Sequence, residues 1–167
     1  MIKNIINQLE FNNLVAKICR SISLDSWRPD YIVGISRGGL LPAVMISHYF
    51  GIPMKPLQVS LRDGNDNDCE SNLWMAEDAF NGTNILIVDD INDQGSTLNW
   101  IMQDWPSGCL PYDERWDYVW GSNVRFAVVV DNLSSQCSKV MNYCGMEVNK
   151  AEKDVWIEFP YEEWWTK

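Results

Sequence analysis

The stretch ILIVDDINDQGST, residues 85–97, joins four apolar residues to three carboxylates and a Gly-Ser-Thr turn. A short apolar run of this kind is typical of a buried strand in a parallel sheet. Asp89 and Asp90 follow it directly, and ligands of parallel α/β sheets bind beyond the carboxyl ends of the strands. An acidic helix N-cap needs only one carboxylate, so we interpret the cluster as part of a ligand site.

The end of the same stretch predicts a phosphate site. A glycine followed by hydroxyl residues at the start of a helix leaves backbone N–H groups that can hold a phosphate. Carboxylates beside a phosphate can accept hydrogen bonds from ribose hydroxyl groups or share a magnesium ion with phosphate oxygens. The stretch therefore predicts a phosphate site whose neighbouring carboxylates either bind hydroxyl groups of a ribose or hold Mg²⁺.

Strand and helix patterns alternate on both sides of this stretch. Before the ILIV strand at 85–88 we expect an amphipathic helix on Phe11, Leu14, Val15, Ile18 and Ile22, a strand at 31–35, a helix at 40–50 buried against a sheet, and a strand at 54–61. After it we expect a helix on Leu98, Ile101, Met102 and Trp105 that Pro106 stops, and then a strand at 125–130. This order predicts an α/β fold with a parallel sheet and right-handed crossovers. At 167 residues and 46% hydrophobic, we expect one domain over 1–167.

Two segments do not fit the alternation. Residues 62–83 are polar and acidic with few apolar anchors, which predicts a long surface loop. Residues 104–124 are longer than a usual connection and contain Trp105, Trp116 and Trp120, which indicates either a small packed cap or a subunit contact.

Composition narrows the function classes. With 13 Lys and Arg against 23 Asp and Glu, the net charge of −10 opposes a broad interaction with nucleic acid or an anionic membrane. No stretch reaches the roughly 18 apolar residues of a membrane span and no signal-like region opens the chain, so we expect a cytoplasmic protein. Five cysteines without a CxxC pair predict reduced thiols rather than disulfides or zinc, and His48, in an apolar helix, is a poor catalytic base.

Three motifs resemble one family. ILIVDDINDQGST resembles the 5-phosphoribosyl 1-diphosphate motif of the type I phosphoribosyltransferases, and VGISRGGLLPA resembles their pyrophosphate loop. KDVWIEFPYEEW resembles the purine-binding end of the xanthine-guanine and hypoxanthine enzymes. The resemblance implies transfer of a 5-phosphoribosyl group to a purine, a 6-oxopurine above all, with release of pyrophosphate, in nucleotide salvage. It also implies Mg²⁺ and a homo-oligomer, either dimer or tetramer.

The resemblance also implies a role for individual residues. Asp89 and Asp90 match the pair that holds the ribose hydroxyls and Mg²⁺, and Asp93 matches the acceptor of the proton on the purine ring nitrogen. The other matches are Gln94, Gly95, Ser96 and Thr97 at the 5-phosphate, Ser36, Arg37, Gly38 and Gly39 at the pyrophosphate, Ser60 and Arg62 at the start of a flexible hood loop over 62–83, Trp156 stacked on the base, and the backbone of Ile157 and Glu158 at the ring edge. A buried core tryptophan is the alternative for Trp156.

Some positions depart from the family pattern. Asn92 stands where an aliphatic residue is usual, and Gln94 stands where Thr is usual. The family's lysine that donates to the purine O6 is replaced at the strand end by Asp131 and Asn132. Asn132 could donate instead, Lys139 could reach back, or Asp131 could accept from an exocyclic amine of a different base.

Three functions agree with these observations. The first is an active purine phosphoribosyltransferase. The second is a regulatory protein of the same fold that binds the phosphoribosyl ligand without catalysis, and the third is an unrelated nucleotide-binding α/β module. Binding of phosphoribosyl diphosphate and release of pyrophosphate distinguish them.

Overall fold

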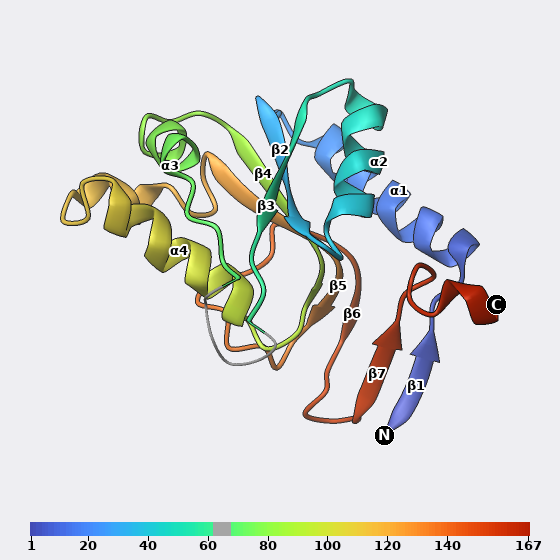
Figure 1. The fold of residues 1–167 in the computed structure, drawn as a ribbon. Helices are drawn as coiled ribbons and strands as arrows, with labels where there is room; N and C mark the ends of the chain where they lie inside the picture. Colours follow the sequence, from blue (N-terminus) through green and yellow to red (C-terminus); the bar gives the residue numbers. More distant parts are fainter. Residues whose placement is uncertain (62–67) are drawn as a thin grey trace.

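The computed structural model describes residues 1–61 and 68–167, and its centre is a five-stranded parallel sheet (Figure 1). The strand order is β3-β2-β4-β5-β6. The strands are β2 (Tyr31–Ser36), β3 (Met54–Gln58), β4 (Ile85–Asn92), β5 (Val124–Asn132) and β6 (Tyr143–Val148). The predicted α/β class with a parallel sheet is therefore confirmed, and β6 is a strand that the sequence analysis missed.

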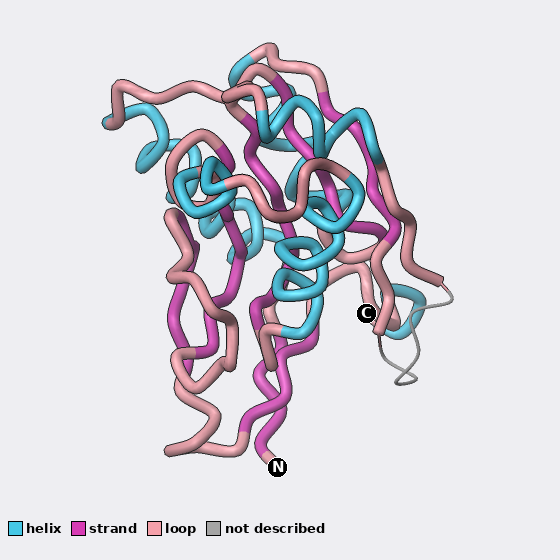
Figure 2. The backbone as a smooth tube through the Cα atoms, turned by 90° about the vertical axis from the view of Figure 1, so that its left-hand side faces the viewer, coloured by secondary structure: helices cyan, strands magenta, loops and turns pink. Residues whose placement is uncertain are grey.

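Four helices cover the two faces of this sheet. On one face lie α1 (Gln8–Leu24) and α2 (Leu40–Phe50), and on the other lie α3 (Leu73–Phe80) and α4 (Ser96–Gly108). Figure 2 views the molecule from the side of α3 and α4, with the sheet behind them. Successive residues of β4 supply both cores, since Ile85 and Ile87 pack toward α3 and α4 while Leu86 and Val88 pack toward α1 and α2.

The two ends of the chain form a separate small sheet. Strand β1 (Ile2–Ile5) pairs in parallel with β7 (Val155–Glu158), so that Lys3 lies opposite Trp156. Glu158 is buried there, and its carboxylate contacts the ammonium groups of Lys3 at 2.6 Å and Lys167 at 3.6 Å. The pairing holds the C-terminal segment beside the main sheet (Figure 1).

The buried carboxylate predicts a pH dependence of stability. The hydrogen bond and charge of Lys3 hold the pKa of Glu158 below its usual range. A lowered pKa in the folded state stabilises the protein above the unfolded pKa of about 4.3, and this contribution is lost as the pH falls through the folded value. We expect Glu158→Gln to lower the free energy of unfolding at pH 7 and to flatten its decline below about pH 4.3, as measured by urea titrations. The exposed Glu152→Gln is the control, and an equally steep decline in both variants would contradict the assignment.

The predicted loop over 62–83 is wrong in its last part. Helix α3 begins after Asn72, whose side chain accepts the N–H of Met75, and it buries Met75, Ala76, Ala79 and Phe80. The buried residues are separated by one, three and one positions, which is a helical spacing. The sequence analysis overlooked this pattern because the segment as a whole is polar and acidic. Residues 62–67, which hold the start of the expected hood loop, lie outside the described residues.

One of the two helix predictions beside the motifs needs correction. Pro106 does not stop α4 but lies in its last turn, which continues to Gly108, because a missing N–H there removes only one backbone bond. Helix α2 is buried against the sheet as predicted, through Pro42, Ala43 and Ile46, and it leaves Leu41 and Val44 more than a third exposed.

The tryptophan-rich segment is a packed cap within the chain. The Trp120 ring lies 5.8 Å from those of Trp105 and Trp116 and 6.1 Å from that of Phe126, measured between centroids. Trp116 is carried by a short 3₁₀ helix, η1 (Glu114–Tyr118), and is 5% exposed. Of the two alternatives for residues 104–124, the structure contains the packed cap.

Two further expectations concern cysteines and membranes. All five cysteines lie in the described residues, and the structure joins none of them in a disulfide. Among the helices of the described ranges, none is long and apolar enough to cross a bilayer.

Candidate functional site

The carboxylates of the opening motif lie where β4 separates from β2. The pairing of β2 with β4 ends at Gly34 and Val88, whereas β4 stays paired with β5 as far as Asn92 and Asp131. Asp89 and Asp90 therefore lie inside β4, not after it as the sequence predicted. Because β2 has turned away at this point, the carboxyl edge of the sheet opens beside them.

The loop SRGG packs directly on this part of β4. A Cβ atom added to Gly38 would lie 2.0 Å from Oδ2 of Asp90, and one added to Gly39 would lie 2.4 Å from the carbonyl oxygen of Val88. Only glycine permits so close an approach of backbone and carboxylate. The two motifs, separated by some fifty residues of sequence, thus meet at Asp90.

Tyr161 joins the C-terminal segment to the same point. Its hydroxyl donates to Oδ2 of Asp90 at 2.8 Å and lies 3.3 Å from the carbonyl oxygen of Gly38. Burial and the neighbouring carboxylate raise the pKa of Tyr161, so the hydroxyl remains a donor at neutral pH. The sequence analysis missed this residue, because no spacing within KDVWIEFPYEEW distinguishes it from the other aromatic residues.

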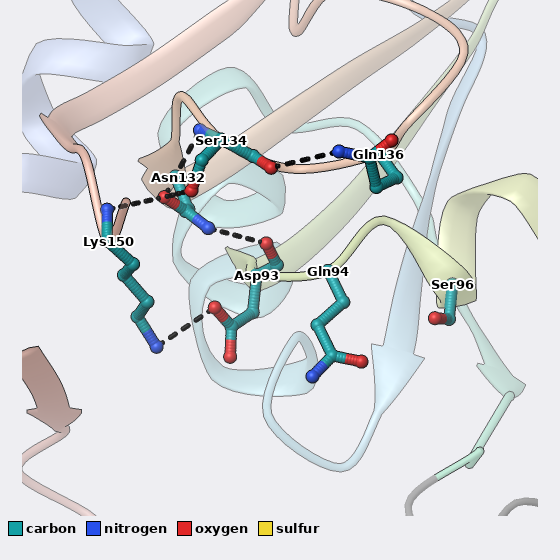
Figure 3. Close-up of a pocket in the computed structure, with 7 residues that line it drawn as sticks. All are labelled: Asp93, Gln94, Ser96, Asn132, Ser134, Gln136 and Lys150. Carbon is teal, nitrogen blue, oxygen red and sulfur yellow. Dashed lines mark hydrogen bonds and ion pairs between the residues drawn. The ribbon is translucent and has the colours of Figure 1, made fainter. Parts of the chain in front are cut away.

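The second half of the motif lines a cavity of about 500 Å³ (Figure 3). Gly95 has a φ of 88° and turns the chain from β4 into α4, and a Cβ there would lie 2.3 Å from the backbone nitrogen of Cys137. The loop after β5 folds onto this turn, where the N–H of Gln136 donates to the carbonyl oxygen of Gln94 at 3.0 Å. The lining residues are Asp93, Gln94, Ser96, Asn132, Ser134, Gln136 and Lys150. Thr97, one residue into α4, is half-buried but does not line the cavity.

Two of the residues that depart from the family pattern, Asn92 and Asp131, bond to each other. The amide of Asn92 donates to Oδ1 of Asp131 at 2.9 Å, and its oxygen accepts from Ser135. Asn132 is 5% exposed, donates to the carbonyl oxygen of Asp93 at 2.8 Å and accepts the backbone N–H of Lys150 at 3.0 Å. Asp131 is not among the residues that line the cavity, whereas Asn132 lines it and donates one amide N–H to the backbone of Asp93. The pair Asn92 and Asp131 therefore explains both departures as one structural contact.

A lysine that the sequence analysis did not single out lies in the cavity. The ammonium of Lys150, in the turn after β6, is 2.9 Å from Oδ1 of Asp93. It also lies 5.8 Å from the ring centroid of Trp156. Lys139, the alternative weighed from the sequence, is exposed and does not line the cavity. The signal for Lys150 was absent from the local sequence because the turn reaches Asp93 only through the pairing of β5 with β6.

Trp156 and Ile157 have opposite environments on β7. Trp156 is 46% exposed, which excludes the alternative of a buried core residue, and Ile157 is 5% exposed. Trp156 does not line the cavity, but its ring lies beside Lys150, which does. Its exposed ring is a surface on which a flat ligand can stack.

Two of the four predicted pyrophosphate residues, Arg37 and Gly38, line a second hollow of about 400 Å³. Its lining residues are Arg37, Gly38, Leu40, Leu41, Val44 and Tyr161. Arg37 is exposed there, while Ser36 ends β2 opposite Gln58 of β3. Ser60 is half-buried and its carbonyl oxygen accepts the thiol of Cys69, whereas Arg62 lies outside the described residues.

The carboxylates fit a partial magnesium site. Within the described ranges, no three His, Cys, Asp or Glu residues form a group that could hold a metal by themselves. Oδ1 of Asp89 accepts the N–H of Asp90, and Oδ1 of Asp90 accepts the N–H of Ile91, which orients both carboxylates. Magnesium often binds one or two carboxylates together with water and substrate phosphates, so this pair suits an ion that arrives with a phosphate ligand.

Comparison with known proteins agrees with the motifs. A profile of the family described as "Phosphoribosyl transferase domain" matches residues 1–163. Xanthine-guanine phosphoribosyltransferase of Cereibacter sphaeroides is 29% identical over 140 residues, 82% of this chain and 70% of that protein. Xanthine phosphoribosyltransferase 1 of Saccharomyces cerevisiae is 27% identical over 122 residues, so the match spans only 58% of the yeast protein.

Solved structures share the fold over nearly the whole chain. A purine phosphoribosyltransferase from Pyrococcus horikoshii has a TM-score of 0.67 and 24% identity, covering 97% of this chain and 95% of that one. The xanthine-guanine-hypoxanthine phosphoribosyltransferase of Helicobacter pylori has a TM-score of 0.69 and 13% identity, covering 98% and 96%. At these identities the likeness is one of fold.

Proposed function

Because this chain belongs to the phosphoribosyl transferase domain family, we propose that it transfers the 5-phosphoribosyl group of 5-phosphoribosyl 1-diphosphate to a purine base, as a step of nucleotide salvage. The observation that carries the proposal is the meeting of two motifs at Asp90, where the Gly38 backbone leaves no room for a Cβ. A pyrophosphate-binding loop and a ribose-binding carboxylate must be neighbours if both hold one substrate.

The charged ends of the substrate would be bound by separate groups. The N-terminus of α4, with Gly95, Ser96 and Thr97, offers backbone N–H groups to the 5-phosphate. Arg37 and the backbone of Gly38 and Gly39 would take the pyrophosphate. These local donors are needed because the chain as a whole, at −10, repels a polyanion.

The reaction replaces one bond at the anomeric carbon of ribose. Its bond to a pyrophosphate oxygen breaks, a bond to a ring nitrogen of the base forms, and the base loses a proton. Asp89 and Asp90 would hold the ribose hydroxyls. Asp93 would accept a hydrogen bond from the ring N–H of the base, or take up its proton. The same Asp89 and Asp90 carboxylates would hold Mg²⁺, which neutralises charge on the departing pyrophosphate when bound.

The finer features of this assignment are also proposals. We propose a 6-oxopurine as the preferred base, because the cavity beside Asp93 contains a lysine donor. We propose a cytoplasmic location, which the five reduced cysteines support. We propose a homo-oligomer, dimer or tetramer, which the exposed apolar residues Leu41, Val44 and Tyr49 of α2 support.

The experiment is to measure pyrophosphate release from phosphoribosyl diphosphate and Mg²⁺ with hypoxanthine, guanine, xanthine and adenine. Release that depends on a purine supports the transferase. Tight binding of the phosphoribosyl substrate without release for any base would contradict it and would leave the regulatory, non-catalytic alternative.

The exposed ring of Trp156 predicts a selective effect on base binding. Stacking on an aromatic side chain contributes about 1–3 kcal/mol per base, so Trp156→Ala should raise KM for the base about 10-fold or more. KM for the phosphoribosyl substrate should change little, because no contact among the described residues joins the Trp156 ring to Asp90 or Arg37. Trp74→Ala is the control, since Trp74 is equally exposed on the distant α3. An equal rise of both KM values would contradict the stacking role.

A further inference from the structure

The ion pair between Lys150 and Asp93 lies inside the candidate base cavity rather than on an open surface. The side chains are 19% and 38% exposed, and the ammonium to carboxylate distance is 2.9 Å. Lys150 is the one cation among the described residues that line the cavity. Figure 3 shows its side chain extending toward Asp93, with Gln94 directed to the same side.

One buried amide holds both partners in place. The oxygen of Asn132 accepts the backbone N–H of Lys150 at 3.0 Å, and its nitrogen donates to the carbonyl oxygen of Asp93 at 2.8 Å. The N–H of Leu133 donates to the carbonyl oxygen of Val148 at 2.8 Å, which fixes the turn that carries Lys150. The backbone that carries each partner is therefore fixed at the end of the main sheet, so the two side chains start from neighbouring points.

The ion pair between Lys150 and Asp93 contributes little to folding stability. Exposed ion pairs typically contribute about 0–1 kcal/mol, and burying charges at a cavity wall costs solvation. The groups instead present one acceptor and one donor side by side, next to the exposed ring of Trp156. An ionised carboxylate only accepts and an ammonium only donates, so the complementary ligand edge carries an N–H beside an acceptor oxygen.

We propose that Lys150 is a specificity-determining residue that blocks Asp93 until a base with an oxo group beside a ring N–H displaces the ion pair. This inference rests on the proposed function. A 6-oxopurine has its exocyclic oxygen next to the N7 edge, so it satisfies both groups at once. Adenine has an amino group at this position. The Lys150 ammonium then has no acceptor, because two hydrogen-bond donors, the ammonium and the amino group, face each other.

The ion pair also explains how the site works without a lysine at the end of β5. Asp131 bonds to Asn92 and does not line the cavity, and the buried Asn132 amide bonds to the backbone of Asp93 and Lys150. The donor comes instead from the next connection, between β6 and β7. The carboxylate that accepts from the ring nitrogen and the cation that reads the oxygen are thus coupled before the base arrives.

The test compares Lys150→Met, which keeps the length of the side chain and removes the charge, with the exposed neighbour Lys153→Met. For each protein, kcat/KM is measured with hypoxanthine, guanine and adenine by pyrophosphate release. Loss of a hydrogen bond from a charged donor should lower the oxopurine values about 10- to 100-fold in Lys150→Met only. The adenine value should stay constant or rise, so that the preference collapses, and Lys150→Arg should restore part of it.

Further readouts keep the outcomes distinct. The midpoint of thermal unfolding should not change, since Lys150 contacts no core residue in the described part of the chain. A higher KM for phosphoribosyl diphosphate would place Lys150 at the 5-phosphate, whose proposed residues Gln94 and Ser96 line the same cavity, and would overturn the inference. Equal loss for all bases, no loss, or a loss found in Lys139→Met instead would overturn the inference while leaving the transferase intact. If the wild type releases no pyrophosphate, the proposed function fails. In that case Lys150 is tested by measuring the dissociation constants of inosine and adenosine 5′-monophosphates for the wild type and for Lys150→Met. If the ratio of the two constants is the same in both proteins, Lys150 has no role in specificity.

Discussion

Replacement of both Asp89 and Asp90 by Asn is expected to lower kcat/KM for the phosphoribosyl substrate by about 100-fold or more, because positioning of the ribose and the partial metal site are lost together. Each oxygen that accepts a backbone N–H is retained in Asn, and two adjacent anions no longer repel each other. The free energy of unfolding should therefore fall by no more than about 1.5–3 kcal/mol, the contribution of the one hydrogen bond that Tyr161 loses at Oδ2 of Asp90. Steady-state kinetics and urea titrations measure the two effects.

The matched control for this double variant removes two carboxylates elsewhere. Glu114 and Asp117 are exposed on η1, so Glu114→Gln with Asp117→Asn changes the net charge equally without touching the site. Wild-type kinetics in the Asp89 and Asp90 variant would contradict the assignment. A second check is Tyr161→Phe, which removes the hydroxyl bound to Asp90 and should change affinity for the phosphoribosyl substrate more than for the base.

Gly39→Ala is expected to lower the free energy of unfolding by about 2 kcal/mol or more, and activity with it. The added Cβ would lie 2.4 Å from the carbonyl oxygen of Val88 and 2.8 Å from that of Ile35. Both are backbone atoms of the central strands β4 and β2, so neither can move without disturbing the sheet. Urea unfolding measures the effect.

Two other glycines provide the comparison for Gly39. Gly108 ends α4 with its nearest neighbour 3.8 Å from an added Cβ, so Gly108→Ala should be nearly neutral. In Gly38→Ala the nearest neighbours of the added Cβ are side-chain atoms of Asp90 and not backbone atoms of the sheet, so the main effect should be on substrate binding. Equal stability losses in Gly38→Ala and Gly39→Ala would show that the loop as a whole, and not the contact with β4, is what glycine permits.

The sequence by itself determined the class of the fold and the positions of the two phosphate-binding motifs. The apolar runs of β2, β4 and β5 are buried on both faces, and a run of this type has few alternatives to a central parallel strand. The face of α1 is readable because Phe11, Val15, Ile18 and Ile22 repeat at helical spacing. The carboxylates and glycines of the motifs are local patterns, whose chemistry is set within a few residues.

Only the tertiary structure decided which residues from separate segments meet. Lys150 reaches Asp93 through the register of β5 with β6, and Asn92 reaches Asp131 through the register of β4 with β5. The pairing of β1 with β7 likewise joins the two ends of the chain, from strands too short to show a pattern. Each of these contacts depends on strand order and register, which are set by packing of the whole core and leave no signal in the sequence around either partner.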